Sequence, residues 1–234
     1  MPFISGAIRH NRQRRPFNHT RASIGGVLAL RAVVFDYGMV LTGPPDPEAW
    51  AAMLRITGLP EERFQRLYWA DRPVYDEGKL TGLGYWQKLL REAGLPPDQA
   101  EELNRWDQRL WTTENPAMLA WQQQLKQRGL LTAILSNMGD DVLANVEREF
   151  DWIHRFDVLV WSYQARMVKP NPDLYRYTLE KLGTRPEETL FLDDKAVNVE
   201  AARALGMKAL EFTTVERLRE ELIEARLDDI LPLP

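Results

Sequence analysis

The sequence predicts an α/β protein with a Rossmann-like parallel sheet, helices on both faces and an inserted helical cap domain. Three observations predict this fold class. Short apolar runs of strand length recur along the chain, helical patterns separate them, and one purely helical interval is far longer than an ordinary crossover. With 44% hydrophobic and 27% charged residues, the 234-residue chain also has the composition of a globular protein.

The first expected strand covers residues 31–36, where apolar and β-branched side chains indicate a strand buried on both faces. A turn cluster follows at Gly43–Pro47. From there to Thr112 the pattern is helical, with no expected strand. Prolines and glycines divide this interval into expected helices at 47–57, 61–71, 82–93 and 97–110.

Strands and helices alternate over the rest of the chain, which predicts a parallel sheet covered on both faces. Strands are expected at 130–135, 158–161, 189–192 and 208–212. Helices are expected at 116–128, 140–150, 172–182, 196–205 and 215–225. We therefore interpret residues 44–112 as the cap, and residues 31–43 with 113–234 as the α/β core.

Residues 1–30 form a basic N-terminal extension with five arginines and no acidic residue. This composition fits a disordered extension, which we favour, or a transit peptide. The rest of the chain is acidic, because the formal net charge is −4, and this argues against nucleic acid as the main partner. No apolar run is long enough to span a membrane, so we expect no membrane partner and take the cytoplasm as the default location. We expect a monomer or a homodimer.

The chain contains no cysteine and only three histidines. Thiolate catalysis and thiolate metal sites are therefore excluded, and a zinc site is not expected. Metal chemistry would have to use carboxylates, which favours a hard cation such as Mg²⁺.

Side chains capable of chemistry follow four of the expected strands. Ligands of open α/β sheets bind at the carboxyl ends of the strands, so these side chains should meet at one edge. Each alone is common as a helix cap or turn residue, and only their convergence predicts a site. They are Asp36 after the first strand, Ser136 and Asn137 after the second, Lys169 beyond the third, and Asp193 and Asp194 after the fourth.

Four segments carry a resemblance to a known family: Val33–Thr42, Ile134–Asn137, Met167–Tyr175 and Phe191–Ala202. In this order and spacing they resemble the four motifs of the haloacid dehalogenase-like hydrolase superfamily, in the subgroup with a helical cap between the first two motifs. The sequence is similar to sugar-phosphate phosphatases and to the phosphatase domain of soluble epoxide hydrolase. The resemblance implies a Mg²⁺-dependent phosphatase that hydrolyses a small phosphorylated metabolite, such as a sugar phosphate, through an aspartyl-phosphate intermediate.

The same resemblance implies roles for individual residues. Asp36 matches the nucleophile, and Ser136 and Lys169 match the groups that hold the phosphoryl oxygens. Asn137 is placed to bind the substrate phosphate or to orient the nucleophile.

The resemblance also implies the ligands of Mg²⁺. Asp36 and Asp194 match acidic ligands, and the carbonyl of Gly38 matches a backbone ligand. Asp193 is expected beside them, binding through water or supporting a ligand.

One position departs from the family pattern. Most phosphatases of this superfamily carry an acid–base Asp two residues after the nucleophile, where this chain has Gly38. Either the leaving group needs little protonation, or a cap residue such as Glu77 supplies the acid and contacts the substrate. Two alternatives remain: a catalytically weak protein that binds a phosphorylated ligand, which Gly38 favours, and a haloacid dehalogenase, which the pair Asp193–Asp194 disfavours.

Overall fold

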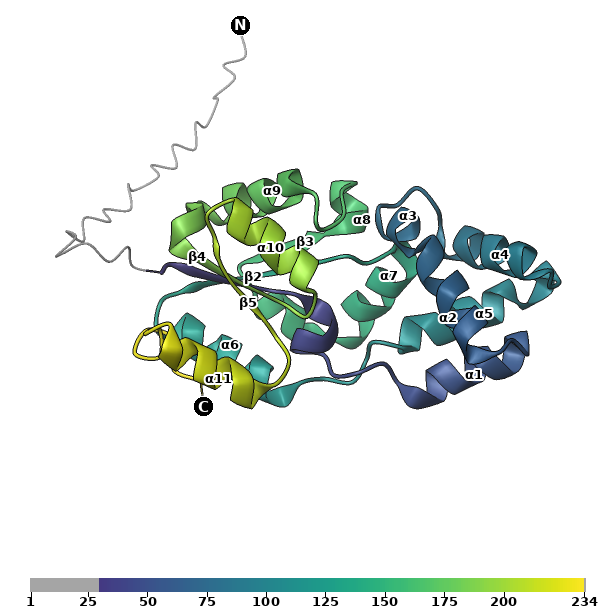
Figure 1. The fold of residues 1–234 in the computed structure, drawn as a ribbon, viewed down its shortest axis with the longest axis horizontal. Coiled ribbons are helices and arrows are strands. Elements are labelled where there is room, and N and C mark those ends of the chain that lie inside the picture. Colours follow the sequence, from purple (N-terminus) through teal and green to yellow (C-terminus); the bar gives the residue numbers. More distant parts are fainter. Residues whose placement is uncertain (1–29, 234) are drawn as a thin grey trace, which may run out of the picture.

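The computed structural model describes residues 30–233, and five parallel strands form its single sheet, in the order β3-β2-β1-β4-β5 (Figure 1). The strands are β1 (Ala32–Phe35), β2 (Leu131–Ser136), β3 (Val158–Trp161), β4 (Thr189–Asp193) and β5 (Lys208–Glu211). The predicted Rossmann-like α/β fold is confirmed. The prediction made for residues 1–30 lies outside the described residues, except at Leu30.

β1 lies at the centre of the sheet, paired in parallel with β2 on one side and β4 on the other. Its side chains alternate between two hydrophobic layers, because successive strand residues point to opposite faces. Val33 and Phe35 belong to the layer that includes residues of α6 and α11, whereas Ala32 and Val34 belong to the layer formed with α9 and α10. The helices of this core are α6 (Pro116–Gln127), α7 (Asp140–Glu149), α8 (Ser162–Ala165), α9 (Pro172–Leu182), α10 (Ala196–Ala204) and α11 (Val215–Glu224).

Local sequence signals set several helix ends. The side chain of Asn171 accepts from a backbone N–H and caps the start of α9, and Gly183 ends this helix with a left-handed φ of 66°. The short elements that were not predicted include a π-type turn at Tyr37–Leu41, α8, and α3 (Arg72–Asp76). Elements of four or five residues are too short to show a helical period in the sequence.

A group of five helices, α1–α5, lies between β1 and β2 in the chain and beyond one end of the sheet (Figure 1). These helices are α1 (Pro47–Thr57), α2 (Glu61–Ala70), α3, α4 (Gly82–Ala93) and α5 (Ala100–Arg109). Buried aromatic rings fill the space between them. The Phe64 ring packs edge-on against Trp50 with ring centroids 5.0 Å apart, and Tyr75 stacks on Tyr85 at 5.1 Å.

The helical group packs against the start of α7. The ring of Tyr75 lies so close to Gly139 that a Cβ built there would be 2.1 Å from ring atom Cζ. Asp140 accepts a hydrogen bond from the backbone N–H of Gly82 at 3.0 Å, and Asp141 accepts one from the Asn104 side chain at 2.7 Å. The group is therefore held against the core by both packing and polar contacts.

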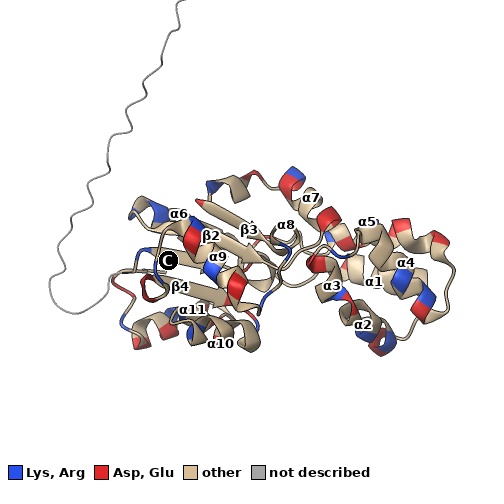
Figure 2. Ribbon diagram, turned by 90° about the horizontal axis from the view of Figure 1, so that it is seen from above, with Lys and Arg blue, Asp and Glu red and all other residues tan. Residues whose placement is uncertain are grey.

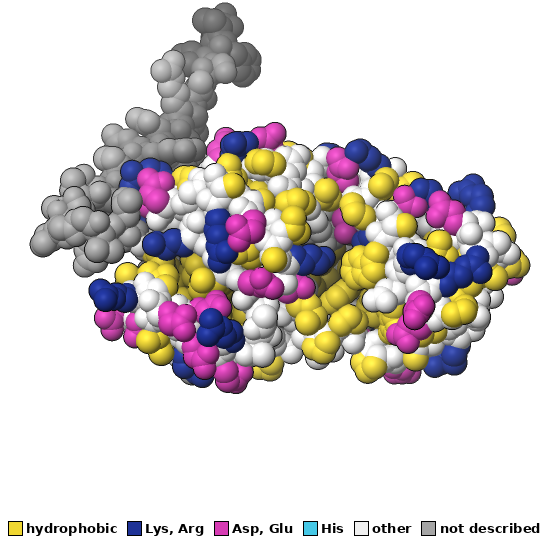
Figure 3. Space-filling view, viewed as in Figure 1, with side chains coloured by type: hydrophobic (Ala, Val, Ile, Leu, Met, Phe, Trp, Pro, Cys, Tyr) yellow, Lys and Arg dark blue, Asp and Glu magenta, His cyan; other side chains and the backbone are white. Residues whose placement is uncertain are grey.

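The described surface carries both signs of charge on its helices (Figure 2). Hydrophobic side chains gather where the helical group meets the core (Figure 3). None of the helices in residues 30–233 has the length and apolar character needed to cross a membrane.

Candidate active site

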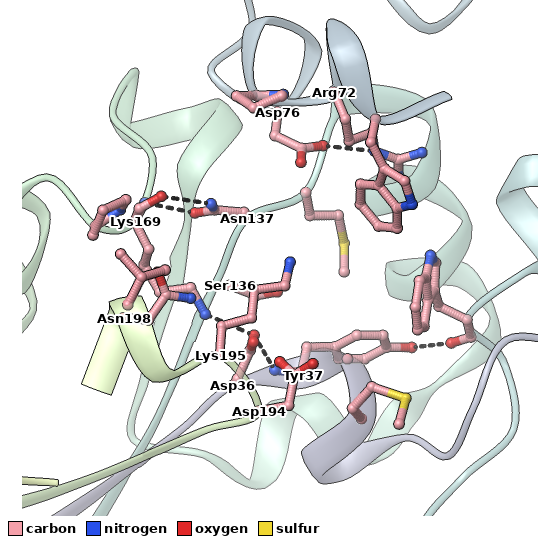
Figure 4. Close-up of a pocket in the computed structure, with 18 of the residues that line it drawn as sticks. Asp36, Tyr37, Arg72, Asp76, Ser136, Asn137, Lys169, Asp194, Lys195 and Asn198 are labelled. Atoms are coloured by element: carbon pink, nitrogen blue, oxygen red, sulfur yellow. Dashed lines mark hydrogen bonds and ion pairs between the residues drawn. The ribbon is translucent and has the colours of Figure 1, made fainter. Parts of the chain in front are cut away.

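A cavity of about 300 Å³ lies where the carboxyl ends of the strands face the helical group (Figure 4). Residues that follow β1, β2 and β4 form one side of it, together with Lys169 from the loop before α9. Residues of α2 and α3 form the opposite side. Of the residues predicted from the sequence, the cavity is lined by Asp36, Gly38, Ser136, Asn137, Lys169 and Asp194.

Asp36 is the first residue after β1 and caps the turn that follows. Its Oδ1 accepts a hydrogen bond from the backbone N–H of Tyr37 at 2.6 Å. Burial raises the pKa of Asp36 to about 7, with further upward contributions from Asp193 and Asp194 that Lys169 partly offsets. A carboxylate held this far from water is poorly solvated, which favours its use as a ligand or a nucleophile.

Lys169 joins two of the carboxylates. Its Nζ lies 2.9 Å from Asp36 Oδ1 and 2.6 Å from Asp193 Oδ2, and the side chain is almost fully buried. Burial alone would lower the pKa of Lys169, but the two carboxylates outweigh it and raise that pKa, so the ammonium stays charged. A fixed cation at the nucleophile is suited to hold an anionic group there.

Asp193 contacts this lysine from a buried position outside the cavity lining. Its Oδ1 accepts from the Asn198 side chain at 2.8 Å and from the backbone N–H of Lys195 at 2.9 Å, while Oδ2 faces Lys169. Asp193 is fully buried and does not line the cavity. Its geometry therefore fits a residue that positions Lys169, whereas Asp194 lines the cavity itself.

The acidic groups fit a divalent cation. Oxygen atoms of Asp36, Asp193 and Asp194 all lie within 4.8 Å of one another, and Gly38 lines the same cavity. Three carboxylates gather here around one buried ammonium, which leaves negative charge uncompensated. An all-oxygen donor set with excess negative charge is the environment that Mg²⁺ prefers.

The side-chain amide of Asn137 is already hydrogen-bonded within the protein, which the sequence did not indicate. Its Nδ2 donates to the Lys169 carbonyl at 3.0 Å, and its Oδ1 accepts from the Lys169 backbone N–H at 2.8 Å. Both ends of the amide are thus engaged by one residue, so Asn137 fixes the loop that carries Lys169. Ser136 is buried at the end of β2 and lines the cavity directly.

Glu77 does not reach the cavity. Its carboxylate pairs with Lys79 at 2.7 Å, and the neighbouring residue Asp76 lines the cavity instead. The structure therefore places Asp76 at the cavity and Glu77 outside it. The adjacent acids Asp76 and Glu77 were the only indication in the sequence. A helix of five residues is too short to show a helical period, so the sequence could not indicate which of the two faces the cavity.

Sequence reasoning did not single out the aromatic and basic residues of the cavity lining, two of which come from the helical group and one of which lies beside Gly38. Trp69, Arg72 and Trp111 all line the cavity, whereas most aromatic residues of the helical group are buried among its helices. Lys195 lies over the Trp69 ring, 5.3 Å from its centroid, and so joins the two sides at the cavity mouth. The Trp111 ring lies 3.7 Å from where a Cβ on Gly38 would be.

Comparisons with known proteins agree with this geometry. The sequence profile of haloacid dehalogenase-like hydrolases matches residues 30–206. A phosphatase from Mycobacterium tuberculosis is 31% identical over 188 residues, covering 78% of this chain and 87% of the relative. Mouse bifunctional epoxide hydrolase 2 is 30% identical over 215 residues, covering 82% of this chain but only 38% of that longer protein.

Solved structures show the same fold at lower identity. A HAD family enzyme from Bacteroides thetaiotaomicron, in complex with magnesium and inorganic phosphate, matches with a TM-score of 0.64 and 21% identity, covering 79% of this chain and 95% of that one. L-2-haloacid dehalogenase from Xanthobacter autotrophicus matches with a TM-score of 0.61 and 24% identity, covering 83% of this chain and 82% of that one.

Proposed function

The chain belongs to the haloacid dehalogenase-like hydrolase family, and from this premise we propose that it is a Mg²⁺-dependent phosphatase acting through an aspartyl-phosphate intermediate. The resemblance carried by the four sequence motifs is confirmed by the family match. The observation that carries the proposal is the buried Lys169, whose ammonium contacts Asp36 beside Asp194. We further propose that residues 44–112 act as the cap over this site.

In the proposed reaction, an oxygen of Asp36 attacks phosphorus and the ester oxygen leaves on the opposite side. Lys169 and Ser136 hold the other phosphoryl oxygens, and Asn137 keeps the Lys169 loop in place. This transfer depends mainly on positioning and charge stabilisation, which is why a buried, ion-paired lysine at the nucleophile supports it.

Mg²⁺ would be held by Asp36, Asp194 and the Gly38 carbonyl, with Asp193 supporting the site through Lys169. When bound, the cation neutralises charge on the transferring phosphoryl group and draws the nucleophile and the phosphate together. The donor set and the uncompensated negative charge support this assignment.

The cavity lining supports a leaving group with an apolar face. Three large hydrophobic side chains are exposed among the described residues, and two of these, Trp69 at 42% and Val197 at 59%, line the cavity from opposite sides. Trp111 and Met138 add further apolar surface. Exposed apolar side chains around a cavity favour a ligand that covers them. We therefore rank aryl and alkyl phosphates above the sugar phosphates that the sequence indicated.

A haloacid dehalogenase is the second candidate, because such an enzyme shares the fold. The carboxylates Asp193 and Asp194 argue against it. A carboxylate substrate would approach Asp36 among further negative charges, with Lys169 as the only buried cation that contacts this nucleophile in the described part.

The test is a panel of phosphate esters, assayed for phosphate release with Mg²⁺ and with EDTA, beside 2-chloropropionate assayed for chloride release. We expect phosphate release that requires Mg²⁺ and disappears in Asp36→Asn, with aryl and alkyl esters ahead of sugar phosphates. Halide release without metal would establish the dehalogenase. Mg²⁺ binding without turnover of any ester would support the binding protein.

A further inference from the structure

The missing acid at Gly38 leaves the proposed phosphatase without a proton donor on the nucleophile loop. In an in-line displacement the leaving oxygen lies on the far side of phosphorus from the attacking atom. Here the far side of the cavity is formed by the helical group. The acidic side chains that line the cavity in the described chain are Asp36, Asp194 and Asp76, and only Asp76 comes from that far side.

We propose that Asp76 supplies the acid–base function that Gly38 cannot, by protonating the leaving oxygen and later activating water. This inference rests on the proposed phosphatase function. In Figure 4, Asp76 and Arg72 lie across the cavity from Asp36 and Asp194, with Ser136 between the two groups. A phosphoryl group held by Ser136 and Lys169 would present its leaving oxygen to Asp76.

The backbone of Asp76 is fixed to the sheet core rather than only to its own helix. Its carbonyl accepts a hydrogen bond from Ser162 Oγ at 2.6 Å, and the same Oγ accepts one from the backbone N–H of Met138 at 2.8 Å. Met138 follows the phosphate-binding segment at the end of β2. One buried hydroxyl therefore sets the distance between the cap acid and the core half of the site, as a proton donor requires.

The side chain of Asp76 is oriented by a single partner. Arg72 Nε donates to Asp76 Oδ1 at 3.2 Å, while the other carboxylate oxygen is turned toward the cavity interior (Figure 4). Both side chains are buried. Arg72 thus holds one oxygen of the carboxyl group and leaves the other for a proton.

Burial and the neighbouring basic side chains act on the pKa of Asp76 in opposite directions. Burial raises the pKa of Asp76, Arg72 and Lys195 lower it, and Asp107 raises it again. The net direction is upward. A general acid must hold its proton until the leaving oxygen takes it, and an upward shift of the carboxyl pKa is the direction that this role requires.

The proton balance of the two steps is complete. In the first step a bond forms between Asp36 and phosphorus, the bond from phosphorus to the ester oxygen breaks, and that oxygen takes the proton of Asp76 to leave as an alcohol. In the second step water gives a proton to the Asp76 carboxylate as its oxygen bonds to phosphorus. The bond between phosphorus and Asp36 then breaks, which releases phosphate and restores both aspartates.

The experiment compares wild type and Asp76→Asn on a series of phosphate esters, from an alkyl phosphate to 2,4-dinitrophenyl phosphate, with saturating Mg²⁺. Loss of the acid should slow the alkyl ester by about 10²–10⁴-fold in kcat/KM and the dinitrophenyl ester far less, because its leaving group needs no proton. The phospho-enzyme should also accumulate in Asp76→Asn with the dinitrophenyl ester, seen as a burst, because the second step lacks its base. Glu77→Gln, one residue away and outside the cavity, serves as the matched control and should behave as wild type.

A second variant and a wild-type measurement keep the test independent of folding. Gly38→Asp should restore alkyl-ester turnover to Asp76→Asn, since the added Cβ meets Trp111 at an ordinary 3.7 Å. In wild type, kcat/KM for the alkyl ester should decrease at alkaline pH. The value for the dinitrophenyl ester should show no such decrease. Equal leaving-group dependence in wild type and Asp76→Asn, or identical pH profiles for the two esters in wild type, would overturn the inference. Failure of wild type to turn over any ester would instead overturn the proposed function.

Discussion

Replacement of Arg72 by methionine tests whether the helical group α1–α5 is held together by a buried charge cluster. The side chain of Arg72 is 6% exposed and that of Asp107 is fully buried. The guanidinium Nη1 lies 2.9 Å from Asp107 Oδ1, Nε lies 3.2 Å from Asp76 Oδ1, and the Tyr68 hydroxyl donates to Asp107 at 2.8 Å. Arg72→Met would leave two buried carboxylates without their cation.

The expected cost is about 3–5 kcal/mol in the free energy of unfolding, the range found when one partner of a buried ion pair is removed. The double variant Arg72→Met/Asp107→Leu should cost less than Arg72→Met alone, because only one buried carboxylate, Asp76, is then left without its cation, although the Tyr68 hydroxyl also loses its acceptor. Urea denaturation followed by tryptophan fluorescence measures both. Arg217→Met, in an exposed network with Glu220 and Glu221, is the control and should leave the midpoint unchanged.

The pH dependence of this loss has a definite sign. Burial raises the pKa of Asp76 above its unfolded value, and Arg72 opposes that shift in the wild type. Without Arg72, the charged carboxylate destabilises the folded state at high pH, and protonation removes that penalty as the pH falls. The deficit of Arg72→Met should therefore be larger at pH 8 than at pH 5. A loss below about 1 kcal/mol at pH 8, or a double variant that loses the sum of the two single losses, would refute the reasoning.

Three further predictions concern the proposed metal site and the contact between the helical group and the core. Mg²⁺ affinity, measured by isothermal titration calorimetry, should weaken as the pH falls through about 7, because the cation must displace the proton of Asp36; Asp36→Asn should bind weakly with a flatter profile. Gly139→Ala should lower the free energy of unfolding, measured in urea, by about 1–3 kcal/mol, because its Cβ would lie 2.1 Å from the Tyr75 ring. The control Gly43→Ala, whose Cβ meets its nearest neighbour at 3.5 Å, should lower it clearly less. Equal losses in the two variants would contradict the packing of Tyr75 on Gly139. Ser162→Ala removes the hydroxyl that joins the helical group to the β2 loop, and it should lower the free energy of unfolding by about 1–3 kcal/mol. It should also lower kcat more than it raises KM, and an unchanged kcat would contradict a positioning role.

The α/β core could be predicted from the sequence because its signals are local. The strand expected at 158–161 and the helices expected at 47–57, 82–93 and 172–182 have the predicted bounds. The three inner strands, β1, β2 and β4, are apolar runs buried on both faces, and turn or capping residues mark many element ends. The strand ends then predict where the polar side chains of the site lie, since the carboxyl ends of parallel strands meet at the same edge of the sheet. That reasoning brought Asp36, Ser136, Lys169 and Asp194 to one cavity.

The half of the site that the helical group forms could not be predicted in the same way. A helical pattern shows that a helix has a buried face, but the same pattern fits burial inside the cap and burial against a ligand. Tyr75 and Trp69 illustrate this, because the first packs on Gly139 and the second lines the cavity mouth. The choice between Asp76 and Glu77 depended on a helix of five residues, where one position changes the direction of a side chain by about 100°.

The sequence by itself thus determined the family, the fold and the residues at the strand ends, because these follow from local patterns and from motifs of fixed spacing. Only the tertiary structure decided that Asp193 is buried behind Lys169 and that Asn137 is engaged by the Lys169 backbone. It also decided that Asp76 and Arg72 face the nucleophile. The physical reason is that these contacts join segments far apart in the chain, and their geometry is set by how the helical group packs against the sheet core rather than by any residue alone.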